Sequence, residues 1–263
     1  MTTVKDILHY VETLAPKYMK FDWDNVGLLC GDPAAKVTKV LVALDPFEHV
    51  CREAAAAGAE LIVTHHPLIF QASKAVTTET SIGRSIMALC ANGISAINAH
   101  TNLDCAPGGI NDILAEKLGL TGISVVNPSG TDEAGRPYGL LRTGTVEQQT
   151  LEAFLPQVKR ALRCEGLRYV RGNGKVHKVA VGGGSCGSGL MEAYDAGCDT
   201  FVTADVKYNQ FWDAKELGMN LIDAGHFATE NPVVPVLAEK IAAAFPEIEV
   251  LISKTHGDCM KYY

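Results

Sequence analysis

An internal repeat constrains this chain more than any other feature of its sequence. The segment Val-x-Lys-Val at 37–40 recurs at 176–179, and Ile-Val-Thr at 62–64 corresponds to Phe-Val-Thr at 201–203, both at an offset of 139 residues. Two copies aligned without a gap predict a duplicated architecture, in which two similar lobes are related by a pseudo-two-fold axis.

Each copy alternates strand-like and helix-like segments. In the first copy, residues 40–44 and 60–64 have the apolar pattern of buried strands. The intervening residues 48–58 have the pattern of a helix ended by a glycine. This alternation predicts an α/β fold with largely parallel sheets, whose functional residues gather at the carboxyl ends of the strands.

A turn-rich, apolar-poor segment at 130–139 marks the expected boundary between the lobes. The last part of the chain is expected to return to the first lobe across a shared seam. We therefore expect residues 1–125 plus 225–263 to form the first α/β lobe and residues 126–224 the second.

Composition excludes several classes of protein. The formal net charge of −7 argues against nucleic acid as a partner, because binding a phosphate backbone needs a basic surface. No segment resembles a signal peptide or a membrane span, so we expect a soluble cytoplasmic protein that has no membrane partner. The eight cysteines include no C-x-x-C pair, which disfavours both a disulfide framework and a thiolate metal site.

Histidines and carboxylates follow three of the predicted strands. One such histidine is usually structural, but clustered imidazoles and carboxylates are the ligands that a divalent metal needs. The other four histidines, at 9, 49, 177 and 256, lie outside these segments, and we interpret them as surface or packing residues. The candidate set is His65, His66, His100, Asp104, His226 and Glu230.

The adjacent pair His65 and His66 suggests two metals rather than one. Neighbouring residues of an extended strand point to opposite sides, so the two imidazoles would serve two neighbouring ions. His226 and Glu230 are four residues apart and would share one face of a helical turn. Without a thiolate in the set, Zn²⁺, Mn²⁺, Fe²⁺, Co²⁺ and Ni²⁺ all stay open.

A glycine-rich segment at 182–189 offers a second hypothesis. It contains G-x-G-x-x-G between a predicted strand and a helix, and Asp205 lies near the spacing expected for a ribose partner. The same glycines also suit tight packing, and their backbone amides could cradle a phosphate. Residues 21–29, which surround Trp23, predict only a structured loop.

Six motifs together resemble the Nif-three-like family, often named type 2 GTP cyclohydrolase I. They are WDNVGLLCGDP (23–33), THHPLIF (64–70), NAHTNLD (98–104), GGGSCGSG (182–189), TADVKYNQ (203–210) and DAGHFATE (223–230). The resemblance covers essentially the whole chain. It implies two similar α/β lobes, a dinuclear metal site at the lobe interface, and a toroidal homohexamer built as a trimer of dimers. The sequence between the repeats is too short for the inserted middle domain of longer members.

The same resemblance assigns ligands. It implies that one ion takes His66 and Asp104, the other takes His65 and His226, and Glu230 bridges both. It places His100 close by. Because His100 is the one clustered imidazole not needed as a ligand, we take it as the candidate catalytic acid or base.

The leading hypothesis is a dinuclear metal-dependent hydrolase that acts on a nucleotide-like small molecule through a metal-bound hydroxide. The alternative is a non-catalytic protein that binds, transfers or senses metal with the same ligands. A ring that encircles DNA is a third interpretation, which the acidic charge disfavours.

Overall fold

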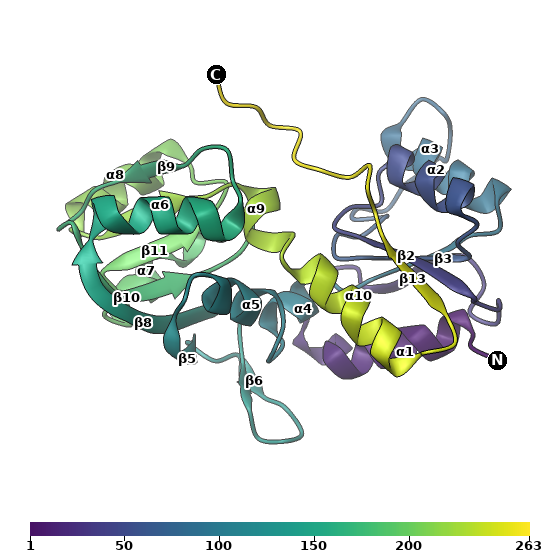
Figure 1. Cartoon of the computed structure of the whole chain (residues 1–263), viewed down its shortest axis with the longest axis horizontal. Helices are drawn as coiled ribbons and strands as arrows, with labels where there is room; N and C mark the ends of the chain where they lie inside the picture. Colours follow the sequence, from purple (N-terminus) through teal and green to yellow (C-terminus); the bar gives the residue numbers. More distant parts are fainter. The chain divides into compact units, whose positions relative to one another are not determined.

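The computed structural model describes residues 1–263, which divide into two compact units (Figure 1). Unit 1 comprises Met1–Leu103 and Val233–Gly257, and unit 2 comprises Asp104–Pro232 and Asp258–Tyr263. These boundaries differ from the expected ranges 1–125 plus 225–263 and 126–224. Residues 104–125 belong to unit 2 because α5 (Ile110–Lys117) packs on β8 (Leu141–Thr150) and β5 (Thr121–Val126) pairs with it.

Unit 1 is built on a five-stranded sheet in the order β1-β4-β3-β2-β13. The four strands β2, β3, β4 and β13 run parallel, and β1 pairs with β4 in the antiparallel sense. The carboxyl ends of the parallel strands therefore meet at one edge of the sheet. The strands are β1 (Gly27–Cys30), β2 (Lys39–Ala43), β3 (Leu61–Thr64), β4 (Ser95–Asn98) and β13 (Glu249–Ile252).

Amphipathic helices connect these strands. The first helix, α1 (Val4–Leu14), begins at a capping box in which Thr3 and Asp6 satisfy each other's backbone N–H groups. The apolar sides of α2 (Glu48–Ala57) and α3 (Ser81–Ala91) join the core of unit 1. The remaining helical segments are η1 (Lys17–Met19), α4 (Thr101–Cys105), which begins in this unit, and α10 (Val233–Ala244).

Unit 2 has a six-stranded sheet in the order β5-β8-β10-β11-β12-β9. Strands β10 (Lys175–Val181), β11 (Thr200–Thr203) and β12 (Asn220–Asp223) run parallel, with antiparallel strands at both sides. The turn-rich segment forms a small hairpin. Its strands are β6 (Gly130–Thr131) and β7 (Pro137–Tyr138); the other elements are β9 (Arg168–Val170), α6 (Leu151–Leu162), η2 (Gly187–Gly189), α7 (Leu190–Asp195), α8 (Tyr208–Glu216) and α9 (His226–Glu230).

The two units share a β-α-β-α-β order and the same local contacts at aligned positions. In unit 1, Glu60 accepts hydrogen bonds from the N–H groups at the start of β2, and Lys39 donates to the carbonyl of the last residue of α2. In unit 2, Asp199 and Lys178 make the corresponding contacts with β10 and with the carbonyl that follows α7. The sequence repeat is thus accompanied by equivalent hydrogen bonds.

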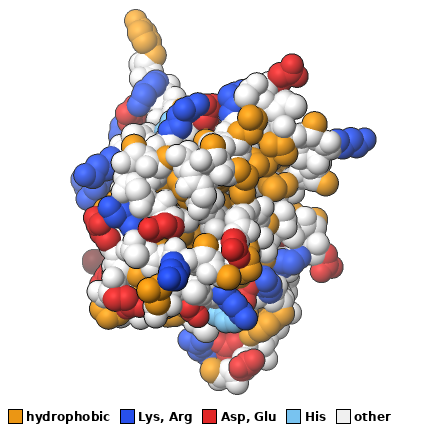
Figure 2. Space-filling model, turned by 90° about the vertical axis from the view of Figure 1, so that its right-hand side faces the viewer, with side chains coloured by type: hydrophobic (Ala, Val, Ile, Leu, Met, Phe, Trp, Pro, Cys, Tyr) orange, Lys and Arg blue, Asp and Glu red, His pale blue; other side chains and the backbone are white.

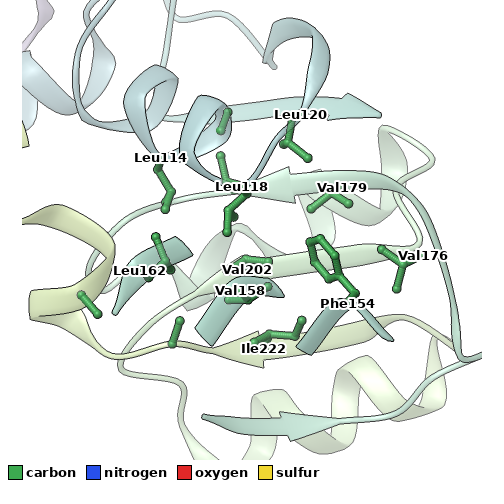
Figure 3. Close-up of a cluster of buried hydrophobic side chains, with 14 of the residues drawn as sticks. Leu114, Leu118, Leu120, Phe154, Val158, Leu162, Val176, Val179, Val202 and Ile222 are labelled. Carbon is green, nitrogen blue, oxygen red and sulfur yellow. The ribbon is translucent and has the colours of Figure 1, made fainter. Parts of the chain in front are cut away.

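The core of unit 2 lies between α5, α6 and one face of the sheet (Figure 3). Phe154 of α6 is fully buried there among aliphatic side chains, including Val179 of β10 and Ile222 of β12. This apolar layer packs against β10, β11 and β12 and so holds in place the strands that precede the polar residues at their carboxyl ends.

None of the helices combines the length and apolar character that crossing a membrane requires. On the face shown in Figure 2, lysine and arginine side chains are dispersed among acidic ones.

Replacing Phe154 by Ala should lower the free energy of unfolding of unit 2 by about 3–5 kcal/mol, because the change removes buried apolar area and leaves a cavity. The measurement is urea unfolding followed by circular dichroism. Tyr208→Ala, at a side chain that is 78% exposed, should change the midpoint little. Equal losses in both variants would contradict this placement of the core.

Candidate metal centre

Three histidines of unit 1 gather at the carboxyl edge of its sheet. His65 and His66 follow β3, and His100 follows β4; their candidate ligand atoms all lie within 4.8 Å of one another. The sequence predicted that the two adjacent imidazoles would point to opposite sides. Instead β3 ends at Thr64, and the His65 and His66 ring centroids are 4.8 Å apart.

The first two rings are each held through Nδ1 by an oxygen atom. His65 Nδ1 donates to the Ala99 carbonyl at 2.9 Å, and His66 Nδ1 donates to Asp45 Oδ1 at 2.7 Å. Because each acceptor can only accept, the proton is on Nδ1, and Nε2 is the ring atom whose lone pair can bind a cation. Such a partner behind the ring is characteristic of metal-ligating histidines.

His100 is held in the same manner by Asp24. Its Nδ1 donates to Asp24 Oδ1 at 2.8 Å, while Thr101 donates to Asp24 Oδ2 through its backbone N–H at 3.0 Å and its hydroxyl at 2.5 Å. Burial opposes ionisation of Asp24, but the hydrogen bonds from His100 and Thr101 outweigh it and lower the pKa to about 2. A buried, ionised carboxylate therefore fixes this imidazole.

Asp45 connects His66 to a second imidazole, that of His256. His256 Nε2 donates to Asp45 Oδ2 at 2.9 Å. Burial opposes ionisation of Asp45, but the hydrogen bonds from His256 and His66 outweigh it and lower its pKa. Glu53 on α2 anchors the segment before His256 by accepting from Lys254 N–H at 2.7 Å. The side chain of His256, predicted as a surface or packing residue, is only 6% exposed and supports a candidate ligand through Asp45.

In unit 2 a histidine and a carboxylate that are candidate ligands lie close together just after β12. His226 and Glu230 lie on α9, with 2.9 Å between His226 Nε2 and Glu230 Oε2, as their four-residue spacing predicted. His226 Nδ1 donates to Asp205 Oδ2 at 2.7 Å. A neutral imidazole that donates from Nδ1 directs its Nε2 lone pair at the Glu230 carboxylate, so a proton or a cation between them is favoured.

Asp104 lies on α4 and is buried. Asn111 secures its backbone: Asn111 Nδ2 donates to the Asp104 carbonyl at 3.1 Å, and Asn111 Oδ1 accepts from Gly183 N–H at 2.7 Å. One buried amide side chain therefore links the backbone of Asp104 to the glycine-rich loop.

The glycine-rich loop gives Glu230 room to approach the backbone. Gly184 has a φ of +60°, and a Cβ added there would lie 1.9 Å from Glu230 Oε1. Gly184 N–H donates to Thr229 Oγ1 at 3.0 Å, and Gly183 N–H donates to Asn111 Oδ1. Two backbone N–H groups of the loop are therefore already bonded to side chains of the protein. Asp205, the residue considered as a partner for a ribose, accepts a hydrogen bond from His226. These contacts favour the tight-packing interpretation over dinucleotide binding.

The donor chemistry in both units consists of imidazoles and carboxylates. Such a set suits borderline and hard divalent cations. Cys186, the buried cysteine in the glycine-rich loop, does not add a thiolate, because burial and then the charge of Asp104 raise the pKa of its thiol well above the ordinary value. The imidazoles and carboxylates present therefore fit a divalent metal ion.

Sequence reasoning overlooked the supporting carboxylates. Asp45 lies two residues after the end of β2, and Asp205 lies two residues after the end of β11, so the strand-end rule that selected the histidines could have selected these as well. Asp24 precedes β1 within the loop around Trp23 and gave no such signal. His256 comes from beyond β13, and its approach to Asp45 depends on chain folding that spacing does not encode.

Comparison with known proteins places the chain among relatives along its whole length. The family model for Duf34/NIF3 (NGG1p interacting factor 3) matches residues 2–258. A Clostridium perfringens protein named GTP cyclohydrolase 1 type 2 homolog is 38% identical over 262 residues, covering 98% of this chain and 99% of the relative. A Clostridium acetobutylicum protein of the same name is 35% identical, with 98% of each chain covered.

Solved structures agree with these matches. A Bacillus cereus protein related to NIF3 gives a TM-score of 0.94 at 26% identity, covering 100% of this chain and 99% of that one. A Staphylococcus aureus hypothetical protein gives a TM-score of 0.91 at 30% identity, with 99% of each chain covered.

Gly184→Ala should weaken binding of Co²⁺ about tenfold or more, because the added methyl group displaces Glu230. The matched control is Gly218→Ala, where φ is +68° and nothing lies within 4 Å of the added Cβ. Both variants carry the left-handed penalty of about 1–2 kcal/mol, but the control should keep its cobalt affinity, measured by spectroscopic titration. Equal affinities in the two variants would contradict the close approach.

Asp45→Asn should reduce Co²⁺ affinity by about 10- to 100-fold, because an amide holds the His66 ring less strongly than a carboxylate does. The same cobalt titration measures the change, with the exposed Asp213→Asn as control. An unchanged affinity would show that Asp45 does not position His66 for a cation.

Proposed function

The chain belongs to the Duf34/NIF3 family, and on this premise we propose that it is a metal-dependent hydrolase with a dinuclear centre to which both units contribute. The proposed ligands from unit 1 are His65 and His66. Those from unit 2 are Asp104, His226 and Glu230.

One observation carries this proposal: four imidazoles in two separate units have the same support. The histidines at 65, 66, 100 and 226 each donate Nδ1–H to an oxygen acceptor, and for three of them that acceptor is a carboxylate. Packing alone gives no reason for four rings to share this arrangement at strand ends. Fixing the Nδ1 tautomer aims Nε2 as a ligand, which is what metal binding requires.

The assignment of ligands to two ions is part of the proposal. His66 and Asp104 would bind one ion, His65 and His226 the other, and Glu230 would bridge them. The shared strand order and equivalent hydrogen bonds of the two units support an origin by duplication, in which each copy supplies donors from the same edge of its sheet.

Two bound divalent cations would supply Lewis acidity and lower the pKa of water. The residues of this chain would position the reaction and move protons. His100 is the proposed general acid or base, acting at Nε2, and the ionised Asp24 behind it would stabilise the imidazolium formed when the ring accepts a proton. Because Asp24 is buried, little solvent reaches its carboxylate to compete for the hydrogen bond with His100.

The substrate class proposed is a nucleotide-like small molecule. Two relatives carry the name GTP cyclohydrolase 1 type 2 homolog, and this name is the reason to test GTP first. We extend the proposal to the homohexamer that the family resemblance implies.

His66→Ala and Glu230→Ala should each lose bound metal together with hydrolysis, because each removes a ligand from the centre. Metal content is measured by elemental analysis of purified protein, and hydrolysis by product detection with GTP and with phosphoesters. His9→Ala, at an exposed histidine outside the candidate site, should keep both properties.

Turnover by metal-free His66→Ala protein would contradict the hydrolase mechanism. Stoichiometric metal without turnover of any of these substrates would instead favour the alternative of a metal-binding or metal-transfer protein.

A further inference from the structure

Two large aromatic side chains of unit 1 are exposed beside His100. Trp23 is 61% exposed and Phe70 is 48% exposed, although side chains of this size usually bury most of their surface. The ring centroids of Trp23 and Phe70 are 5.7 Å apart at an interplanar angle of 70°. Both rings also approach His100, at centroid distances of 6.3 and 6.0 Å.

The backbone around these rings is fixed by hydrogen bonds. Asn25 Nδ2 donates to the Ile69 carbonyl at 2.6 Å, which joins the loop carrying Trp23 to the segment carrying Phe70. Phe21 N–H donates to Thr101 Oγ1 at 3.0 Å, and the Phe21 ring lies 5.6 Å from Trp23 at an angle of 32°. The exposed rings are therefore presented by an ordered framework.

The other tryptophan provides a contrast. Trp212 is also exposed, at 49%, but the Lys215 ammonium lies 5.0 Å from the centre of its ring, so a cation already covers one of its faces. Trp23 has only aromatic neighbours among its ring contacts. The two tryptophans thus differ in what their faces meet.

We propose that Trp23 and Phe70 form a stacking platform for the planar heterocyclic ring of the substrate. This inference rests on the proposed function and adds a ring-binding subsite to it. A ring stacked on Trp23 would lie beside His100, so its polar substituents would be within reach of the proposed acid or base. Aromatic faces bind any base by stacking, which explains recognition of a ring without hydrogen bonds specific for guanine.

Charge near the platform favours a ring that carries an anionic group. Lys20 Nζ donates to the Phe21 carbonyl at 3.0 Å, which holds a positive charge at the backbone of the loop that carries Trp23. An ammonium has three donors, so it can also bind a phosphate. The occupant that fits is a nucleotide rather than an uncharged apolar ligand.

The test uses the fluorescence of single-tryptophan proteins. Trp212→Phe leaves Trp23 as the sole tryptophan, and Trp23→Phe leaves Trp212. Guanosine 5′-monophosphate should quench the first protein saturably and leave the second nearly unchanged, while ribose 5-phosphate, which lacks the base, should quench neither. Calorimetric titration should then show Trp23→Ala binding the nucleotide about fivefold more weakly or worse, with Trp23→Phe close to the unsubstituted protein.

Absence of saturable quenching in Trp212→Phe would overturn the platform, as would a second copy of the chain covering Trp23. Equal affinities of Trp23→Ala and the unsubstituted protein would do the same. Failure of the proposed function can be told apart from these results. Nucleotide binding without hydrolysis would contradict the proposed hydrolase function but not the stacking platform. Hydrolysis with a KM that Trp23→Ala leaves unchanged would contradict the stacking platform but not the proposed hydrolase function.

Discussion

The hydrogen bonds that hold each imidazole through Nδ1 are the interaction on which the candidate site depends. An unsupported histidine at a strand end can rotate and change tautomer, and its Nε2 then has no fixed direction. In unit 1 the half-buried carboxylate of Asp45 removes that freedom for His66, and the buried carboxylate of Asp24 does so for His100. Burying these carboxylates is unfavourable, and several charge-assisted hydrogen bonds offset the cost.

The sheets explain why such supports are available. In unit 1 the carboxylate of Asp45 follows β2 and the ring of His66 follows β3, so neighbouring parallel strands bring acceptor and imidazole together at one edge. In unit 2 Asp205 follows β11 and His226 follows β12. The apolar cores beneath these edges keep the strand ends in register.

Much of this arrangement was predictable from the sequence, for physical reasons that also set the limit. Periodicity predicted the strands before His65 and His226, and the four-residue spacing predicted the approach of His226 to Glu230. The close approach of the His65 and His66 rings was missed because extended-strand alternation ends at Thr64. The support from His256 was missed because no local pattern reports a contact across 211 residues.

The most direct test of the proposed dinuclear centre is electron paramagnetic resonance of protein loaded with Mn²⁺. The proposed centre, in which Glu230 would be a shared ligand, predicts two ions per chain with an exchange-coupled spectrum, because a shared carboxylate couples their spins. A single ion per chain, or two ions with the spectrum of isolated Mn²⁺, would contradict the account.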